Sequence, residues 1–234
     1  MTILLVDLVK GEGLSMQIRK QFDSELDRLK SKIVKMAKDS RSQLEKSIKS
    51  IYESDLELAE QVIENDIAID ELDMEINDTA ILLIAKQQPV ASDLRKLIVA
   101  IRIATDLERM ADNAKNIARS TLILGEDHEL DIDLSLQDMS FIAYEMLDLA
   151  IESYLNSDYK LAKKMSDLDD SIDQIFGQVL KRVLDQTATN PQSIQHIMQI
   201  AFVARYIERY GDHLTNIAES ILYQVKGENL DLNE

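Results

Sequence analysis

The chain has 234 residues and a formal net charge of −17 at pH 7. Such a surface repels the phosphates of nucleic acids and of anionic lipids, which argues against sequence-independent nucleic-acid binding and favours cationic or basic partners. The absence of cysteine excludes disulfides and thiolate metal sites. With only 6 Gly and 2 Pro, the chain has too few turn residues for a sheet-rich fold, so composition predicts an all-α protein.

The first fifteen residues differ in character from the rest of the chain. They contain two glycines and show no helical period, so residues 1–15 are expected to form a separate N-terminal arm. A flexible arm, a strand and a start codon placed too far upstream all fit this segment. No apolar run approaches the ~20 residues of a spanning helix, and the start lacks the features of a signal peptide. The protein is therefore expected to be cytoplasmic, with no direct membrane insertion.

Three helices are predicted in the first half of the chain. The first runs from about residue 15 to 52, and its apolar side chains alternate at intervals of four and three, as in a long amphipathic helix: Phe22, Leu26, Leu29, Ile33 and Met36. Ser54-Asp55 caps a second helix that Pro89 ends. Ser92 caps a third helix that reaches about residue 124.

The second half repeats the first. Residues 126–132 lie in an acidic, aperiodic stretch that is interpreted as a linker, and helices are predicted to end near residues 156, 186 and 227. Asp70 and Asp173 are 103 residues apart, and Glu108 and Glu208 are 100 apart. The predicted architecture is two tandem three-helix bundles related by internal pseudo-symmetry, at 16–125 and 133–227, followed by a tail at 228–234.

Acidic residues interrupt the apolar stripe of the third and sixth helices at equivalent positions. Both helices carry Glu-Arg-x-x-Asp-x-x-x-Asn-Ile-Ala, and the second and fifth helices each carry an Asp-x-x-x-Asp pair. Because residues four apart share a helix face, facing pairs would bring four carboxylates together in each bundle. A cation would offset their repulsion, and oxygen ligands suit Mg, Ca, Mn or Fe, with Zn also compatible.

This pattern predicts a metal site in each bundle, with an unknown divalent or trivalent ion such as Fe, Zn, Mg or Mn. The predicted ligands are Asp66, Asp70, Glu108, Asp112, Asp169, Asp173, Glu208 and Asp212. His213, beside Asp212, is a weaker candidate for a nitrogen ligand. A single acidic pair would be better interpreted as part of a solvated helix face. Here an internal repeat places four acidic pairs on the apolar faces of the helices, which favours metal binding.

Three segments carry a resemblance to a known family. They are QQPVASDLRKL (87–97), DLERMADNAKNIA (106–118) and ARYIERYGDHLTNIAE (204–219). At these residues the chain resembles the PhoU family, regulatory proteins that accompany the high-affinity phosphate transporter of bacteria. The resemblance covers about residues 16 to 227, and it implies two three-helix bundles whose acidic pairs hold metal ions or multinuclear clusters.

The resemblance also implies a function. A PhoU-like protein is expected to repress phosphate uptake and the phosphate-starvation response through contact with the transporter ATPase and a membrane sensor histidine kinase. Such contacts would place it peripherally at the inner face of the membrane, and no catalytic activity is expected. Long apolar stripes in a repeat fold favour a homodimer.

Two other functions compete with this expectation. One is a metal store or a metal-assisted hydrolase built from carboxylates alone. The Glu-x-x-His motif of di-iron bundles is absent, because Gly125, Ser193 and Tyr210 stand three residues before the three histidines. The other is a scaffold that binds no metal.

Overall fold

The computed structural model describes residues 2–126, 132–189 and 193–228. These residues form six helices and no strand. The helices are α1 (Thr2–Glu53), α2 (Leu56–Gln87), α3 (Ser92–Leu124), α4 (Ser135–Asn156), α5 (Tyr159–Thr189) and α6 (Ile194–Lys226). The prediction of an all-α protein is confirmed.

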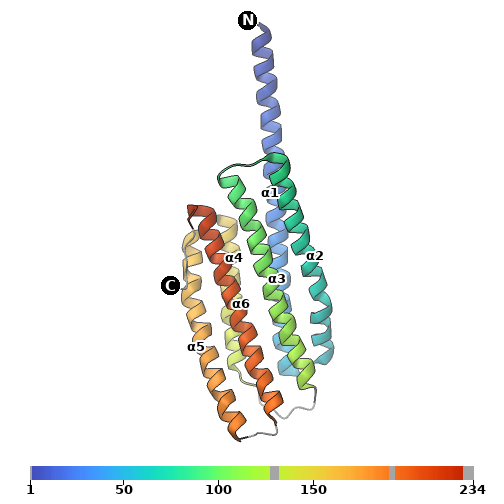
Figure 1. Ribbon diagram of the computed structural model, residues 1–234, viewed down its shortest axis with the longest axis vertical. Helices are drawn as coiled ribbons and strands as arrows, with labels where there is room; N and C mark the ends of the chain where they lie inside the picture. Colours follow the sequence, from blue (N-terminus) through green and yellow to red (C-terminus); the bar gives the residue numbers. More distant parts are fainter. Residues whose placement is uncertain (1, 127–131, 190–192, 229–234) are drawn as a thin grey trace.

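The helices form two antiparallel three-helix bundles that stand side by side (Figure 1). The first bundle contains α1, α2 and α3, and the second contains α4, α5 and α6. The bundles share one continuous apolar core, because α3 lies along α6 and α1 contacts α4. The predicted pair of three-helix bundles is thus confirmed, and α3 and α6, which carry the repeated acidic motif, form most of their junction.

Local chemistry explains several helix ends. Asp55 caps α2, as predicted, by accepting a 2.9 Å hydrogen bond from the backbone N–H of Leu58. Gly227 ends α6 with a positive φ of 77°, the left-handed conformation that glycine adopts most easily. The prediction that Ser92 caps α3 is wrong. Ser92 is the first residue of the helix, and Ala91 precedes it without a side-chain cap.

The N-terminal segment is helical, contrary to the expected arm without helical period. α1 begins at Thr2 and its first part projects beyond the other helices (Figure 1). Two glycines lower helix propensity by about 1 kcal/mol each, but extending an existing helix avoids the cost of nucleation. The predicted linker at 126–132 and tail at 228–234 lie mostly outside the described residues.

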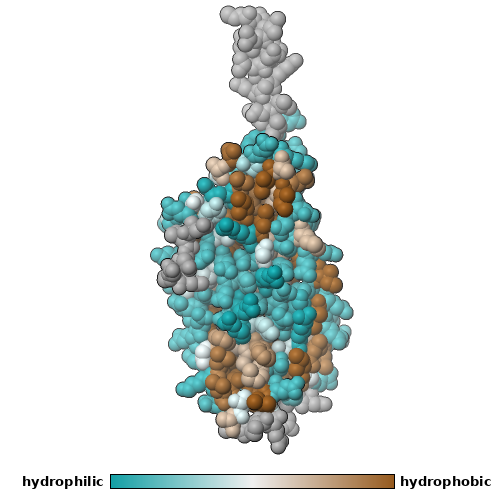
Figure 2. Space-filling model, in the orientation of Figure 1, coloured by the Kyte–Doolittle hydropathy of each residue, from teal (hydrophilic) through white to brown (hydrophobic). Residues whose placement is uncertain are grey.

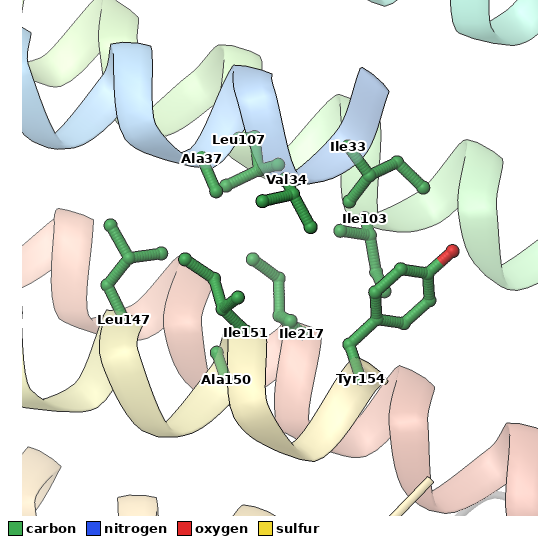
Figure 3. A pocket seen from close by; sticks show the side chains of 10 residues that line it. All are labelled: Ile33, Val34, Ala37, Ile103, Leu107, Leu147, Ala150, Ile151, Tyr154 and Ile217. Carbon is green, nitrogen blue, oxygen red and sulfur yellow. The ribbon is translucent and has the colours of Figure 1, made fainter. Parts of the chain in front are cut away.

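The junction between the bundles is tightly packed. Figure 3 shows apolar side chains from α1, α3, α4 and α6 around a cavity of about 10 Å³, including Ile33, Leu107, Ile151 and Ile217. This volume is at the lower limit for one water molecule, and the lining offers almost no polar partner. The cavity is therefore a packing gap and no ligand site.

The face that carries α3 and α6 has a hydrophilic middle and hydrophobic ends (Figure 2). The acidic motif occupies the midpoint of both helices, since α3 spans 92–124 and α6 spans 194–226. Among the described residues, no helix is long and apolar enough to cross a membrane.

Candidate functional site

The acidic pairs of the first bundle face one another across α2 and α3, and a lysine lies between them. Lys115 on α3 donates hydrogen bonds to Asp66 Oδ2 on α2 and, at 2.5 Å, to Asp112 Oδ1. Asp66 is 3% exposed, so the lysine neutralises a carboxylate that water barely reaches. Arg109 lies at the exposed side, 3.3 Å from Glu108 Oε2 and 3.5 Å from Asp112 Oδ2.

Burial and mutual repulsion act on the remaining acids of this first cluster. Burial, and then the charge of Asp66, raises the pKa of Asp70. Burial, and then the charge of Asp112, raises the pKa of Glu108. The charges of acids on the opposite helix also raise the pKa of each of these two carboxyls. This agrees with the Lys115 contacts, which bring the α2 and α3 pairs to the same place.

Asp73, which is not among the predicted ligands, also belongs to the first cluster. It is partly buried, accepts a 2.9 Å hydrogen bond from Asn77 Nδ2, and has a pKa that burial raises. Its charge also acts on Glu108. A signal was present in the sequence, because Asp73 follows Asp70 by three residues and so shares its helix face.

The second bundle brings its four predicted acids together between α5 and α6. Asp169 and Glu208 are buried, at 7% and 8% exposure. Burial, together with the charges of Asp212 and Asp173, raises the pKa of Asp169 to about 6, although the nearby hydroxyl of Thr215 opposes the shift. Burial, and then Asp212, raises the pKa of Glu208 to about 7. Burial and Asp212 also raise the pKa of Asp173.

One oxygen of this second cluster has no partner. Arg205 Nη1 donates to Glu208 Oε1, but the buried Glu208 Oε2 has no hydrogen-bond partner among the described residues. A buried carboxylate oxygen without a donor is costly, so such an atom is a candidate to bind an ion or a water molecule.

Gly211 makes room for the second cluster. A Cβ atom at this position would lie 3.0 Å from Asp169 Oδ1 and 3.1 Å from Ile172 Cδ1. Glycine therefore lets α5 approach α6 with the carboxylate seated between them. The first bundle has Ala111 at the equivalent position.

The two clusters are consequently not equivalent. Lys115 in the first bundle corresponds to Thr215 in the second, a neutral residue whose hydroxyl donates a 3.5 Å hydrogen bond to the backbone carbonyl of Gly211. Sequence reasoning missed Lys115 because it compared the residues that the two copies share. The sequence could have identified Lys115 through the difference between the two copies. Lys115 follows Asp112 by three residues, so it lies on the same helix face, and the second copy has a threonine there.

The fit of a metal ion differs between the clusters. Within residues 2–126, 132–189 and 193–228, no group of three or more Asp, Glu or His side chains is arranged to hold an ion as it stands. In the second cluster, the donor atoms are all oxygens, the buried Glu208 Oε2 has no partner among the described residues, and no ammonium lies among the acids, which is the chemistry that suits a hard cation. In the first cluster, the Lys115 ammonium occupies that role.

His213, the weaker candidate ligand, is engaged elsewhere. Its Nδ1 lies 3.0 Å from Asp106 Oδ1 on α3, so the side chain links α6 to α3. This contact joins the two bundles near the acidic motif and gives His213 a structural role at the junction.

Comparison with known proteins identifies the family. The PhoU domain family matches residues 33–121 and 136–221, one copy in each bundle. Relatives named phosphate-specific transport system accessory protein PhoU homolog occur in Clostridium acetobutylicum, 31% identical over 92% of this chain and 99% of the relative, and in Aquifex aeolicus, 36% identical over 87% and 92%.

Solved structures agree with this match. The crystal structure of PhoU from Pseudomonas aeruginosa superposes with a TM-score of 0.84 at 28% identity, covering 88% of this chain and all of that one. The phosphate transport system regulatory protein PhoU from Streptococcus pneumoniae gives the same TM-score and identity, over 90% of this chain and 99% of the other. Since both bundles match the domain and relatives align over nearly their whole length, the chain belongs to the PhoU family.

Proposed function

We propose that this protein is a negative regulator of high-affinity phosphate uptake and of the phosphate-starvation response. The observation that carries the proposal is the match of both bundles to the PhoU domain, together with relatives named as accessory proteins of a phosphate-specific transport system. The regulator acts by binding the ATPase of the phosphate transporter and a sensor histidine kinase, and it has no catalytic activity of its own. It works in the cytoplasm, at the inner face of the membrane through these partners, as a homodimer.

An exposed apolar stripe on α2 supports action through protein contacts. Ile67, Met74 and Ile81 follow one another at seven-residue intervals and are 63%, 58% and 58% exposed. Seven-residue spacing places them along one side of the helix, as in the seam of a helix–helix interface. Large apolar side chains gathered on a surface mark interaction sites more often than isolated ones do. We infer that this α2 stripe (Ile67, Met74, Ile81) contacts a partner.

We also propose that the acidic clusters bind a divalent or trivalent cation, with Fe, Zn, Mg or Mn as candidates. The support is the convergence of carboxylates from two helices in each bundle and the raised pKa of several of them, because a cation reverses the cost of holding like charges together. Of the eight predicted acids, the four of the second cluster are the better candidates for ligands, because Lys115 already pairs with two acids of the first cluster.

Deleting the gene is expected to leave phosphate uptake high in phosphate-rich medium. The measurement is initial uptake of radiolabelled phosphate, with expression of a starvation-induced promoter followed in parallel. Complementation with the wild-type chain should restore repression of both. Normal repression in the deletion strain would contradict the assigned role.

Placing aspartate at Ile67 and Ile81 is expected to reduce co-purification with the transporter ATPase or the sensor kinase by about tenfold, a loss of roughly 1.4 kcal/mol in binding. Both side chains are exposed, so stability should change by no more than about 0.5 kcal/mol. Ile123→Asp, at an equally apolar and 50% exposed position on α3, is the matched control. Unchanged capture by the double variant would place the contact elsewhere.

A further inference from the structure

The structural repeat makes it possible to compare the two acidic clusters position by position. Each has an Asp-x-x-x-Asp pair on its second helix and a Glu-x-x-x-Asp pair on its third helix. They differ at the residue three positions after the last aspartate, which is Lys115 in α3 and Thr215 in α6. The comparison therefore isolates one positively charged side chain as the main difference between two otherwise similar sets of carboxylates.

We propose that Lys115 is a built-in counter-cation that closes the first cluster to metal, so that the protein loads metal through its second bundle only. This inference rests on the proposed metal binding of the acidic clusters. The two bundles then have different roles. The carboxylates of the first are neutralised by a lysine side chain of the protein itself, and those of the second by an exchangeable metal ion.

The contacts of Lys115 explain why a metal would not displace it. Its ammonium bonds Asp66 on α2 and Asp112 on α3 at once, and its side chain is 15% exposed. Charge-assisted bonds of this kind are stronger than neutral ones, and an ammonium withdrawn from both partners would leave Asp66 buried and unpaired. A divalent ion in the same space would also meet the positive charge of Lys115 at close range.

The second cluster lacks such a group at its centre. Thr215 is neutral, and the Arg205 side chain that bonds Glu208 Oε1 is 50% exposed. Glu208 Oε2 stays without a hydrogen-bond partner within the described residues, although its side chain is nine-tenths buried. The absence of a Cβ at Gly211 lets Asp169 Oδ1 on α5 come close to the backbone of α6. Asp66 Oδ1 in the first cluster also lacks a partner among the described residues, but the Asp66 carboxylate is paired with Lys115 through Oδ2. The second cluster therefore differs in having buried acids with no ammonium between them.

Titration of the metal-stripped protein with Mn²⁺ tests the inference, with free Mn²⁺ followed by electron paramagnetic resonance. The wild type is expected to bind Mn²⁺ with an affinity that Asp212→Asn lowers by about tenfold or more, since it removes a charged ligand. The equivalent first-cluster variant, Asp112→Asn, is expected to leave the affinity within about twofold, a difference below roughly 0.5 kcal/mol.

Exchanging the residues that differ gives a reciprocal test. Thr215→Lys should lower Mn²⁺ binding about as much as Asp212→Asn does. Lys115→Thr should create additional Mn²⁺ binding that disappears when Asp112→Asn is added. Circular dichroism checks the fold of each variant, and the Thr215→Lys result stands alone if Lys115→Thr does not fold.

The outcomes separate this inference from the proposal on which it rests. No Mn²⁺ binding by the wild type would overturn the metal proposal and the inference with it. Binding that Asp112→Asn and Asp212→Asn weaken equally would uphold metal binding but overturn the asymmetry. Binding by Thr215→Lys at wild-type strength would likewise overturn the role assigned to the lysine.

Discussion

Replacing Lys115 with methionine is expected to lower the free energy of unfolding of the metal-free protein by about 3 kcal/mol. Methionine keeps much of the length of the side chain but removes the ammonium that Asp66 and Asp112 share. Asp66 is 3% exposed and its Oδ1 already lacks a hydrogen-bond partner among the described residues, so losing the bond to Oδ2 would leave its buried charge uncompensated. The cost comes from that orphaned charge more than from the lost attraction.

Urea denaturation of three variants can separate these contributions. Asp66→Asn combined with Lys115→Met should be less destabilising than Lys115→Met alone, because the buried charge is then absent as well. Arg109→Met is the matched control: it removes a cation from the same helix and cluster, but the arginine side chain is 57% exposed and its removal should cost less than about 1 kcal/mol. If Lys115→Met and Arg109→Met lowered the free energy of unfolding equally, the buried ion pair of Lys115 with Asp66 would not have the importance assigned to it.

Helical periodicity was sufficient to predict most of the fold. The four-and-three spacing of Phe22, Leu26 and Leu29 predicts the face of α1 that is buried in the structure. The repeat of 103 and 100 residues predicts two bundles, because copies of one amphipathic unit bury equivalent faces. The start of α1 was less predictable, since Gly11 and Gly13 weaken the local helix signal although the helix continues through them.

The lateral arrangement of the bundles required the structure. Nothing in the helical period shows that α3 lies against α6, or that Asp106 on one bundle meets His213 on the other. Similarly, the spacing of acidic residues predicted which carboxylates converge but not how each is compensated. Asp169 and Glu208 are buried beside a glycine, whereas Asp66 is buried beside a lysine. Those differences depend on tertiary contacts and on burial, which a pattern of matching residues does not contain.

The buried carboxyls of the second cluster should make the metal-free protein less stable as the pH rises. Glu208 keeps its proton up to about pH 7 in the folded protein, but an unfolded glutamate releases it near 4.5. Between these values the folded state binds more protons than the unfolded state, so the free energy of unfolding falls as the pH increases. Asp169, with its pKa raised to about 6, acts in the same direction.

Glu208→Gln should remove the larger part of this slope, because glutamine has no proton to release. Between about pH 5 and about pH 8 in chelator, the wild type is expected to lose about 1–2 kcal/mol relative to the variant. This range lies below the full value of the shift because Asp212, whose charge helps to raise the pKa of Glu208, is only partly buried and solvent screens part of its charge. Glu60→Gln, at an exposed position on α2, is the control and should keep the wild-type slope. If the stability of Glu208→Gln fell with pH as steeply as that of the wild type, Glu208 would be charged over the whole range and the prediction would be wrong. Added Mn²⁺ should flatten the pH dependence of the wild type alone, since the ion stabilises the ionised carboxylates.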